Sequence, residues 1–261
     1  MTEPIKIIDT DSDNILNYGI CGYKNLSRPG YPEKIQWLQD RFAQGLKIKT
    51  LYSEKDGTLG MIEYIPGEYC WRPVEATGYM FIHCIFSGTK SAYKGKGYGS
   101  LLLQGCITDA QKENKHGVAV VTRQGSFMVG KALFEKNGFT VVDTAKPDFE
   151  LLAIKFTPNA PDPQFFGNWE EKLKQYRPGL IILRADQCPY TVKNVGEICA
   201  TAEKKYGIKP TVIDLKSFQE AQNTPGAFGT FCLIYNNKVI SHHPISNTRF
   251  CNIMDKLIGK K

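Results

Sequence analysis

The amino-acid sequence predicts an α/β fold that is divided into two domains. Short apolar segments with the length of strands alternate with segments whose apolar residues recur at helical spacing. A cluster of glycines stands between a predicted strand and a predicted helix, and prolines at 158–163 interrupt the pattern before it restarts. We therefore predict a first domain at 1–157, a linker at 158–167 and a smaller second domain at 168–261.

The first domain is predicted to contain most of the strands. An opening strand covers 5–9, after which Asp11, Ser12 and Asp13 can cap a helix that runs towards Gly22. The elements that follow are a helix at 32–44, strands at 46–53, 59–65 (with a continuation to 71) and 79–86, a helix at 99–113, a strand at 118–122, a helix at 127–136, and strands at 139–142 and 149–156.

The second domain repeats the alternation on a smaller scale. The boundary between the two predicted domains is placed at 158–167, because three prolines in 158–163 cannot lie in a helix interior or a central strand. The predicted elements are helices at 169–176 and 189–206, strands at 180–183 and 211–215, a short helix at 218–222, two strands that flank Asn236 and Asn237, and a helix at 248–257.

Composition and charge narrow the class of protein. The 261 residues are 42% hydrophobic and 23% charged, which is ordinary for a soluble globular protein. No apolar run is long enough to cross a bilayer and no signal peptide is visible, so we expect a cytoplasmic protein without a membrane partner. The net charge of +7 is not gathered in a basic stripe. It suits an anionic small molecule at least as well as a nucleic acid, and we expect no nucleic-acid partner.

The eight cysteines are predicted to be reduced thiols. They include no Cys-x-x-Cys pair and no Cys/His spacing typical of zinc sites, and a chain of this length does not need disulfides to fold. We therefore expect no metal.

The glycine cluster is the most informative stretch. Glycines allow a turn whose N–H groups point towards one place, and the helix that follows adds unpaired N–H groups and its positive dipole end. Such a turn suits a pyrophosphate. The spacing of the glycines does not match a Walker A loop, and a dinucleotide-binding fold would place the turn after its first strand. The competing interpretation is that the glycines serve only a tight turn and bind no ligand. The candidate cofactor-binding residues here are Lys94, Gly95, Lys96, Gly97, Tyr98, Gly99 and Ser100.

Two segments of this region resemble a known superfamily. Lys94-x-x-Gly97-x-Gly99 and the later Ala132-Leu133-Phe134-Glu135-Lys136-Asn137-Gly138-Phe139 resemble conserved segments of the GNAT (Gcn5-related) N-acetyltransferases. The resemblance covers the first 157 residues. It implies a mixed, mostly antiparallel central sheet flanked by helices, with acetyl-CoA as co-substrate. It also implies transfer of the acetyl group to an amine of a small molecule or peptide by direct attack.

The C-terminal part narrows the resemblance. Cys188-Pro189-Tyr190-Thr191 and Phe228-Gly229-Thr230-Phe231 resemble YoaP-type bacterial acetyltransferases, whose second half looks thioredoxin-like. Cys188 at a helix N-terminus would have a stabilised thiolate, but Thr191 stands where a resolving cysteine would be needed. The second domain is then an acceptor-binding or dimerisation module, a monothiol site or a structural unit, and a homodimer is an open expectation.

The resemblance also implies where the chemistry occurs. Backbone N–H groups near Ile85 and Phe86 would stabilise the oxyanion. Phe134 stands where many relatives have a tyrosine that protonates the leaving thiolate. Ser126 or a bound water is the candidate replacement, although a thiol can also leave without full protonation. A protein that binds CoA but has weak or lost turnover is the alternative function that Phe134 supports.

His83 is the candidate general base, because some superfamily members use histidines on this strand and its ordinary pKa suits neutral pH. A packed or surface histidine is the competing interpretation. Glu63 and Glu68 are the next candidates for the base. The aromatic residues Tyr64, Tyr69, Trp71, Tyr79 and Phe81 either line an acceptor pocket or pack in the core.

Overall fold

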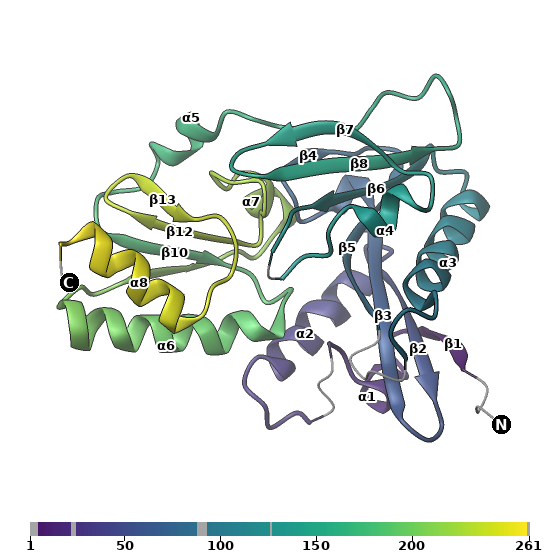
Figure 1. The fold of residues 1–261 in the computed structure, drawn as a ribbon, viewed down its shortest axis with the longest axis horizontal. Coiled ribbons are helices and arrows are strands. Elements are labelled where there is room, and N and C mark those ends of the chain that lie inside the picture. Colours follow the sequence, from purple (N-terminus) through teal and green to yellow (C-terminus); the bar gives the residue numbers. More distant parts are fainter. Residues whose placement is uncertain (1–4, 22–24, 88–92, 126, 260–261) are drawn as a thin grey trace.

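The larger part of the protein is built on a seven-stranded sheet (Figure 1). The structure is a computed structural model that describes all residues except 1–4, 22–24, 88–92, 126 and 260–261. Neighbouring strands are antiparallel except β5 and β6, so the sheet is mixed and mostly antiparallel, as the resemblance implied. In sheet order the strands are β1 (Lys6–Thr10), β2 (Lys47–Ser53), β3 (Gly57–Pro66), β5 (Tyr79–Ser87), β6 (Gly117–Thr122), β8 (Phe149–Lys155) and β7 (Thr140–Ala145).

Two long helices pack on opposite faces of this sheet. α3 (Tyr98–Lys112) buries Leu102, Leu103 and Ile107 in one apolar cluster. α2 (Tyr31–Phe42) contributes Ile35 and Leu38 to the other. Apolar residues three and four positions apart form one stripe on a helix, which explains why each helix covers a single face. The shorter helices of this part are α1 (Ile15–Tyr18), the 3₁₀ turn η1 (Gly67–Tyr69) and α4 (Ala132–Glu135).

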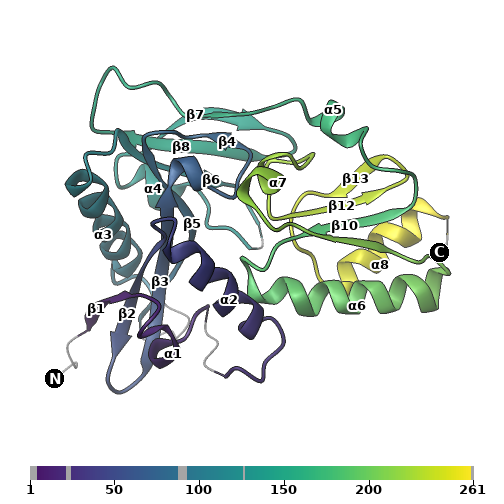
Figure 2. The same ribbon diagram turned by 180° about the vertical axis from the view of Figure 1, so that it is seen from behind.

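The smaller part is built on a four-stranded sheet. Its strand order is β11-β10-β12-β13, and only β10 and β11 are parallel. Figure 2 shows α6 and α8 along one side of this sheet, and α7 next to the larger part. The thioredoxin-like assignment stays a prediction. The elements are α5 (Trp169–Leu173), β10 (Leu180–Arg184), α6 (Pro189–Tyr206), β11 (Thr211–Asp214), α7 (Phe218–Gln222), β12 (Phe231–Tyr235), β13 (Lys238–Ser241) and α8 (Asn247–Leu257).

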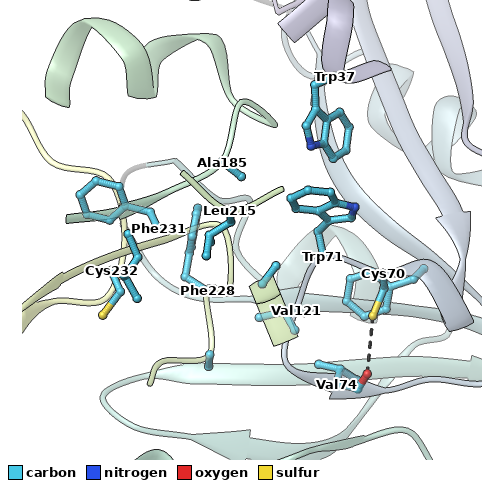
Figure 3. Packing of buried hydrophobic residues seen from close by; sticks show 14 of the residues in the cluster. Trp37, Cys70, Trp71, Val74, Val121, Ala185, Leu215, Phe228, Phe231 and Cys232 are labelled. Atoms are coloured by element: carbon cyan, nitrogen blue, oxygen red, sulfur yellow. Dashed lines mark hydrogen bonds between the residues drawn. The ribbon is translucent and has the colours of Figure 1, made fainter. Parts of the chain in front are cut away.

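The two sheets share one hydrophobic cluster. Trp37 and Trp71 lie edge to face with ring centroids 5.1 Å apart, and Figure 3 shows Phe228 and Leu215 of the C-terminal part beside them. The short strands β4 (Val74–Glu75) and β9 (Gln164–Phe165) pair with each other, which ties the predicted linker to the larger part. The division into two domains therefore stays a prediction, because the core does not stop at the predicted linker.

A buried arginine fastens the same junction. The guanidinium of Arg72 donates hydrogen bonds to the carbonyl oxygen of Phe228 and to Thr230 Oγ1, the second at 3.0 Å. It also lies 4.2 Å from the centre of the Phe228 ring. Nearby, a Cβ added to Gly30 would lie 1.9 Å from the backbone oxygen of Pro189, so α2 and α6 meet backbone against backbone.

Several predicted elements differ in the structure. The strand predicted to continue to 71 ends at Pro66, and η1 follows. The helix predicted at 127–136 is reduced to α4, and Phe127, where it was predicted to begin, has a φ of 69° that a helix does not allow. The helix predicted after Asp13 covers only four residues before Gly19 ends it.

Candidate functional site

The predicted glycine turn leads directly into α3. Gly97 is the N-cap of this 15-residue helix with a φ of 79°, and Gly95 has a φ of 72°. These left-handed conformations favour glycine, and a Cβ added at either position would meet no atom within 4 Å. The backbone is therefore shaped by the glycines, and open space lies beside it.

That space is a cavity of about 490 Å³. It brings together the two segments that carry the family resemblance, since Leu133 and Lys136 line it with the glycine turn. Asn137 Nδ2 holds the segments together by donating to Ser100 Oγ at 3.0 Å and to the Leu133 carbonyl at 2.7 Å. The lining residues are Ile85, Phe86, Ser87, Tyr93, Lys94, Gly95, Lys96, Gly97, Tyr98, Gly99, Ser100, Val129, Leu133 and Lys136. Ile85, Phe86 and the stretch from Lys94 to Ser100, all predicted to contact acetyl-CoA, are among them, whereas Phe134, for which the same contact is predicted, is not.

The cavity lies where the central sheet opens. Pairing between the parallel strands β5 and β6 extends from Tyr79 with Gly117 to Ile82 with Val120 and ends there, although both strands continue. The later residues of β5, among them Ile85 and Phe86, line the cavity. Strands that part in this way leave backbone groups of the sheet available to a ligand.

A β-bulge in β5 lies at the same place. Glu63 of β3 is opposite Cys84, whereas Tyr64 is opposite Ile82, so His83 is the extra residue. Bulges redirect side chains and are frequent next to active sites. His83 and Cys84 also line a second cavity, of about 40 Å³, together with Ile85 and Val129 of the first.

Phe134 lies in the wall of this smaller cavity. Its side chain is almost fully buried and packs edge to face against Phe139, with ring centroids 5.6 Å apart. It therefore supplies apolar surface and no proton. Ser126, the candidate replacement, lies outside the described residues.

His83 is enclosed by its partners. Its Nε2 accepts a hydrogen bond from the Trp71 N–H at 2.9 Å, so the ring proton is on Nδ1, which lies 3.6 Å from Glu63 Oε1. Burial lowers the pKa of His83, although the neighbouring Glu63 opposes this shift. The role of His83 as general base stays a prediction. The hydrogen bond from the Trp71 N–H weighs against that role, because it occupies the Nε2 lone pair that would accept the proton.

Glu63 belongs to a buried ionic network. Its Oε2 lies 2.5 Å from Lys34 Nζ, its Oε1 accepts from Gln187 Nε2 at 3.1 Å, and neither charged side chain of the pair is exposed. Burial works to raise the pKa of Glu63, but Lys34 and His83 outweigh it and lower the pKa to about 2. A carboxylate held this firmly as an anion is a weak proton acceptor at neutral pH.

Glu68 lies at the opposite end of β5 from the cavity. Its Oε1 accepts from the N–H of Gly78, the residue before that strand, at 3.0 Å.

Most of the aromatic residues considered for an acceptor pocket pack in the core. Tyr64, Trp71, Tyr79 and Phe81 are at most 1% exposed, whereas Tyr69 is exposed and packs on Phe218.

Cys188 is the N-cap of α6, as expected for a thiol beside a helix dipole. Burial nevertheless raises its pKa, which opposes formation of a thiolate.

The described residues contain no group of three or more His, Cys, Asp and Glu side chains that could hold a metal ion. Within the same residues, no helix is both long enough and apolar enough to span a membrane.

Lys34, Gln187 and Arg72 were not anticipated from the sequence. One signal could have indicated Lys34, because it lies on the apolar stripe of α2 between Tyr31 and Ile35. A lysine within such a stripe requires a buried acidic partner. Gln187 and Arg72 lie in loops, where no periodicity reveals burial.

The chain is similar in sequence to a known protein over nearly its whole length. The chain is 28% identical over 254 residues, 96% of its own length and 98% of the relative's, to the uncharacterized N-acetyltransferase YoaP of Bacillus subtilis (strain 168). Residues 211–252 match the family model described as YoaP-like. The predicted resemblance to YoaP-type acetyltransferases is confirmed. The sequence similarity to that relative therefore extends over the residues of both sheets.

Solved acetyltransferases are more distant. A ribosomal-protein-alanine N-acetyltransferase from Brucella melitensis is 17% identical, with a TM-score of 0.42 over 58% of this chain and 99% of that one. An acetyltransferase of the GNAT family from Staphylococcus aureus Mu50 is 12% identical, with a TM-score of 0.43 over 59% and 100%.

Proposed function

We propose that the protein is an N-acetyltransferase that moves an acetyl group from acetyl-CoA to an amine of a small molecule or peptide. The observation that carries the proposal is the left-handed turn at Gly95 and Gly97, which opens the 15-residue α3 onto the 490 Å³ cavity. The whole-length similarity to an N-acetyltransferase supports the same reaction.

The residues of the cavity suit the two ends of acetyl-CoA. The N–H groups of the first turn of α3 are unpaired within the helix and can bind a pyrophosphate, and Lys94 and Lys96 add positive charge at the exposed rim. Acetyl-CoA would supply the activated thioester. Backbone N–H groups of β5 near Ile85 and Phe86, where the sheet opens, would polarise its carbonyl oxygen. Phe134 and its neighbours would keep water from the reacting carbon.

The test compares two strained glycine positions. Gly97→Val places a side chain in the cavity, whereas Gly207→Val imposes a similar strain at a φ of 66° and in open space at the C-cap of α6. We expect calorimetry to show a loss of CoA affinity of at least about 10-fold in Gly97→Val and little change in Gly207→Val. Equal affinities in the two variants would remove the assignment of the turn.

Turnover is measured separately, as acetyl-CoA consumption across a panel of amines and small peptides. The proposal expects acceptor-dependent release of CoA that Gly97→Val abolishes. Binding of CoA without release for any amine would instead indicate a protein that has lost turnover.

A further inference from the structure

A glutamine of the C-terminal part reaches a buried carboxylate of the larger sheet. Gln187 lies just before α6 and is 5% exposed. Its Nε2 donates a hydrogen bond to Oε1 of Glu63, on β3, at 3.1 Å. The other carboxylate oxygen of Glu63 is held by Lys34. The position of Oε1 is therefore set by a residue from the other part of the chain.

The same oxygen faces His83. Nδ1 of His83 lies 3.6 Å from Glu63 Oε1, which is too far for a hydrogen bond, and this nitrogen has no hydrogen-bond partner among the described residues. On the far side of the ring, Nε2 is bonded to the Trp71 N–H. Without the bond from Gln187, Oε1 would be available to the Nδ1–H, because buried donors and acceptors seldom stay unpaired side by side. The carboxylate and the imidazole would then move towards each other.

A movement of His83 would change the walls of both cavities. His83 is the extra residue of the bulge in β5, and Glu63 is opposite the next residue, Cys84. His83, Cys84 and Ile85 line the smaller cavity, and Ile85 also lines the larger one. Because these residues are consecutive in one strand, a shift at the bulge is passed along the backbone to the opening in the sheet.

The segment that carries Gln187 is itself firmly attached. On one side of Gln187, the N–H of Ala185 donates to the carbonyl oxygen of Thr230 at 3.0 Å. On the other side, the backbone of Pro189 lies directly against Gly30. A side chain that holds a site within a fraction of an ångström needs such support from its own surroundings. The loop between β10 and α6 therefore presents Gln187 in a fixed position.

We propose that Gln187 is a positioning residue for acetyl transfer, an inference that rests on the proposed function. Gln187 holds Glu63 Oε1 in place and so keeps it from bonding to His83 Nδ1. The bulge then keeps the shape in which the backbone near Ile85 meets the thioester carbonyl. The C-terminal part contributes to the reaction through this side chain, besides burying the shared core. Misplacement by about 1 Å can cost about 100-fold in rate, so one hydrogen bond beside the bulge is enough to affect kcat.

The experiment compares two glutamines that join the C-terminal part to the larger part. Gln187→Met removes the donor to Glu63 and keeps the length of the side chain. Gln222→Met is the matched control, because Gln222 Nε2 donates across the same junction, to the carbonyl oxygen of Cys70 at 3.0 Å. With an amine that the wild type acetylates, Gln187→Met should lower kcat at least about 10-fold and leave the KM for acetyl-CoA unchanged. Gln222→Met should keep nearly the wild-type kcat.

A spectroscopic readout follows His83 itself. The full chain is labelled with ¹⁵N-histidine, and His83→Gln identifies the His83 signals among those of the four histidines. In Gln187→Met the Nδ1 signal should move in the direction of a hydrogen-bonded N–H, whereas Gln222→Met should leave it in place. A role of Gln187 limited to stability would change neither this signal nor kcat in the folded variant.

Gln187→Asn is a second variant, because it keeps the amide but is one methylene too short to reach Glu63. It should show the same loss of kcat, and it decides the question if circular dichroism shows that Gln187→Met does not fold. Unchanged kcat in the folded Gln187 variants, or an equal loss in Gln222→Met, would overturn the inference and leave the proposed function intact. A wild type that binds no CoA in calorimetry, or that acetylates no amine, would remove the proposed function and this inference with it.

Discussion

Lys34 Nζ lies 2.5 Å from Glu63 Oε2, and neither side chain has any solvent exposure. This pair joins α2 to the middle of β3, one strand away from the opening in the sheet. Two charges in such a place are tolerated only together, because each alone would be buried without compensation.

We expect each single substitution in this pair to lower the free energy of unfolding strongly. The double substitution should lower it by less than the sum of the two single effects. Glu63→Gln or Lys34→Met should lower the free energy of unfolding by about 3–5 kcal/mol, since the remaining charge stays buried. Urea unfolding of the four proteins in a double-mutant cycle measures the coupling. The exposed pair Lys6 and Glu54, 3.0 Å apart, is the control and should show almost none. A coupling energy near zero for the buried pair would contradict this picture.

Acid should weaken the protein through the same carboxylate. The pKa of Glu63 is lowered from 4.5 to about 2, so its contribution is present above about pH 4.5 and is lost as the pH falls towards 2. The loss amounts to about 3 kcal/mol for a shift of this size. Unfolding free energies measured between about pH 5 and about pH 2, compared with those of Glu63→Gln over the same range, isolate this contribution. Parallel curves for the two proteins would argue against the shift.

His83 is expected to position β5 and not to transfer the proton. His83→Gln keeps an acceptor for the Trp71 N–H and should retain most of kcat, whereas His83→Ala should lose about 1–3 kcal/mol of stability. Rates are measured with the same amine over a range of pH, alongside thermal unfolding. A fall in kcat of about 100-fold in His83→Gln at neutral pH, with recovery at high pH, would identify His83 as the base after all.

A chain truncated after Phe156 is expected not to fold stably. It would expose Trp37 and Trp71 and would leave the Arg72 guanidinium without Phe228 and Thr230. Circular dichroism, dye binding and denaturant unfolding can be compared with a chain that lacks only the residues after Leu257. Cooperative unfolding of the truncated chain would contradict the expectation and support the predicted boundary at 157.

The sequence was most informative where a local conformation requires one residue type. Gly95 and Gly97 could be recognised because a left-handed turn before a helix favours glycine, and the order of the larger sheet's elements followed from periodicity. The network of Lys34, Glu63 and Gln187 could not be found in this way, because its members come from three distant segments. Their proximity is set by tertiary packing, which spacing along the chain does not report.

The close approach of Gly30 to Pro189 bears on how such a protein can change over generations. No side chain fits at position 30 unless the backbone of α6 moves, and the guanidinium of Arg72 is fitted to one carbonyl and one hydroxyl of the other part. A second half borrowed from another protein would have to reproduce these surfaces before it could be accommodated. Such chains should therefore be inherited and diversified as wholes, and a substitution on one side of the junction should persist mainly where the other side has changed to match it.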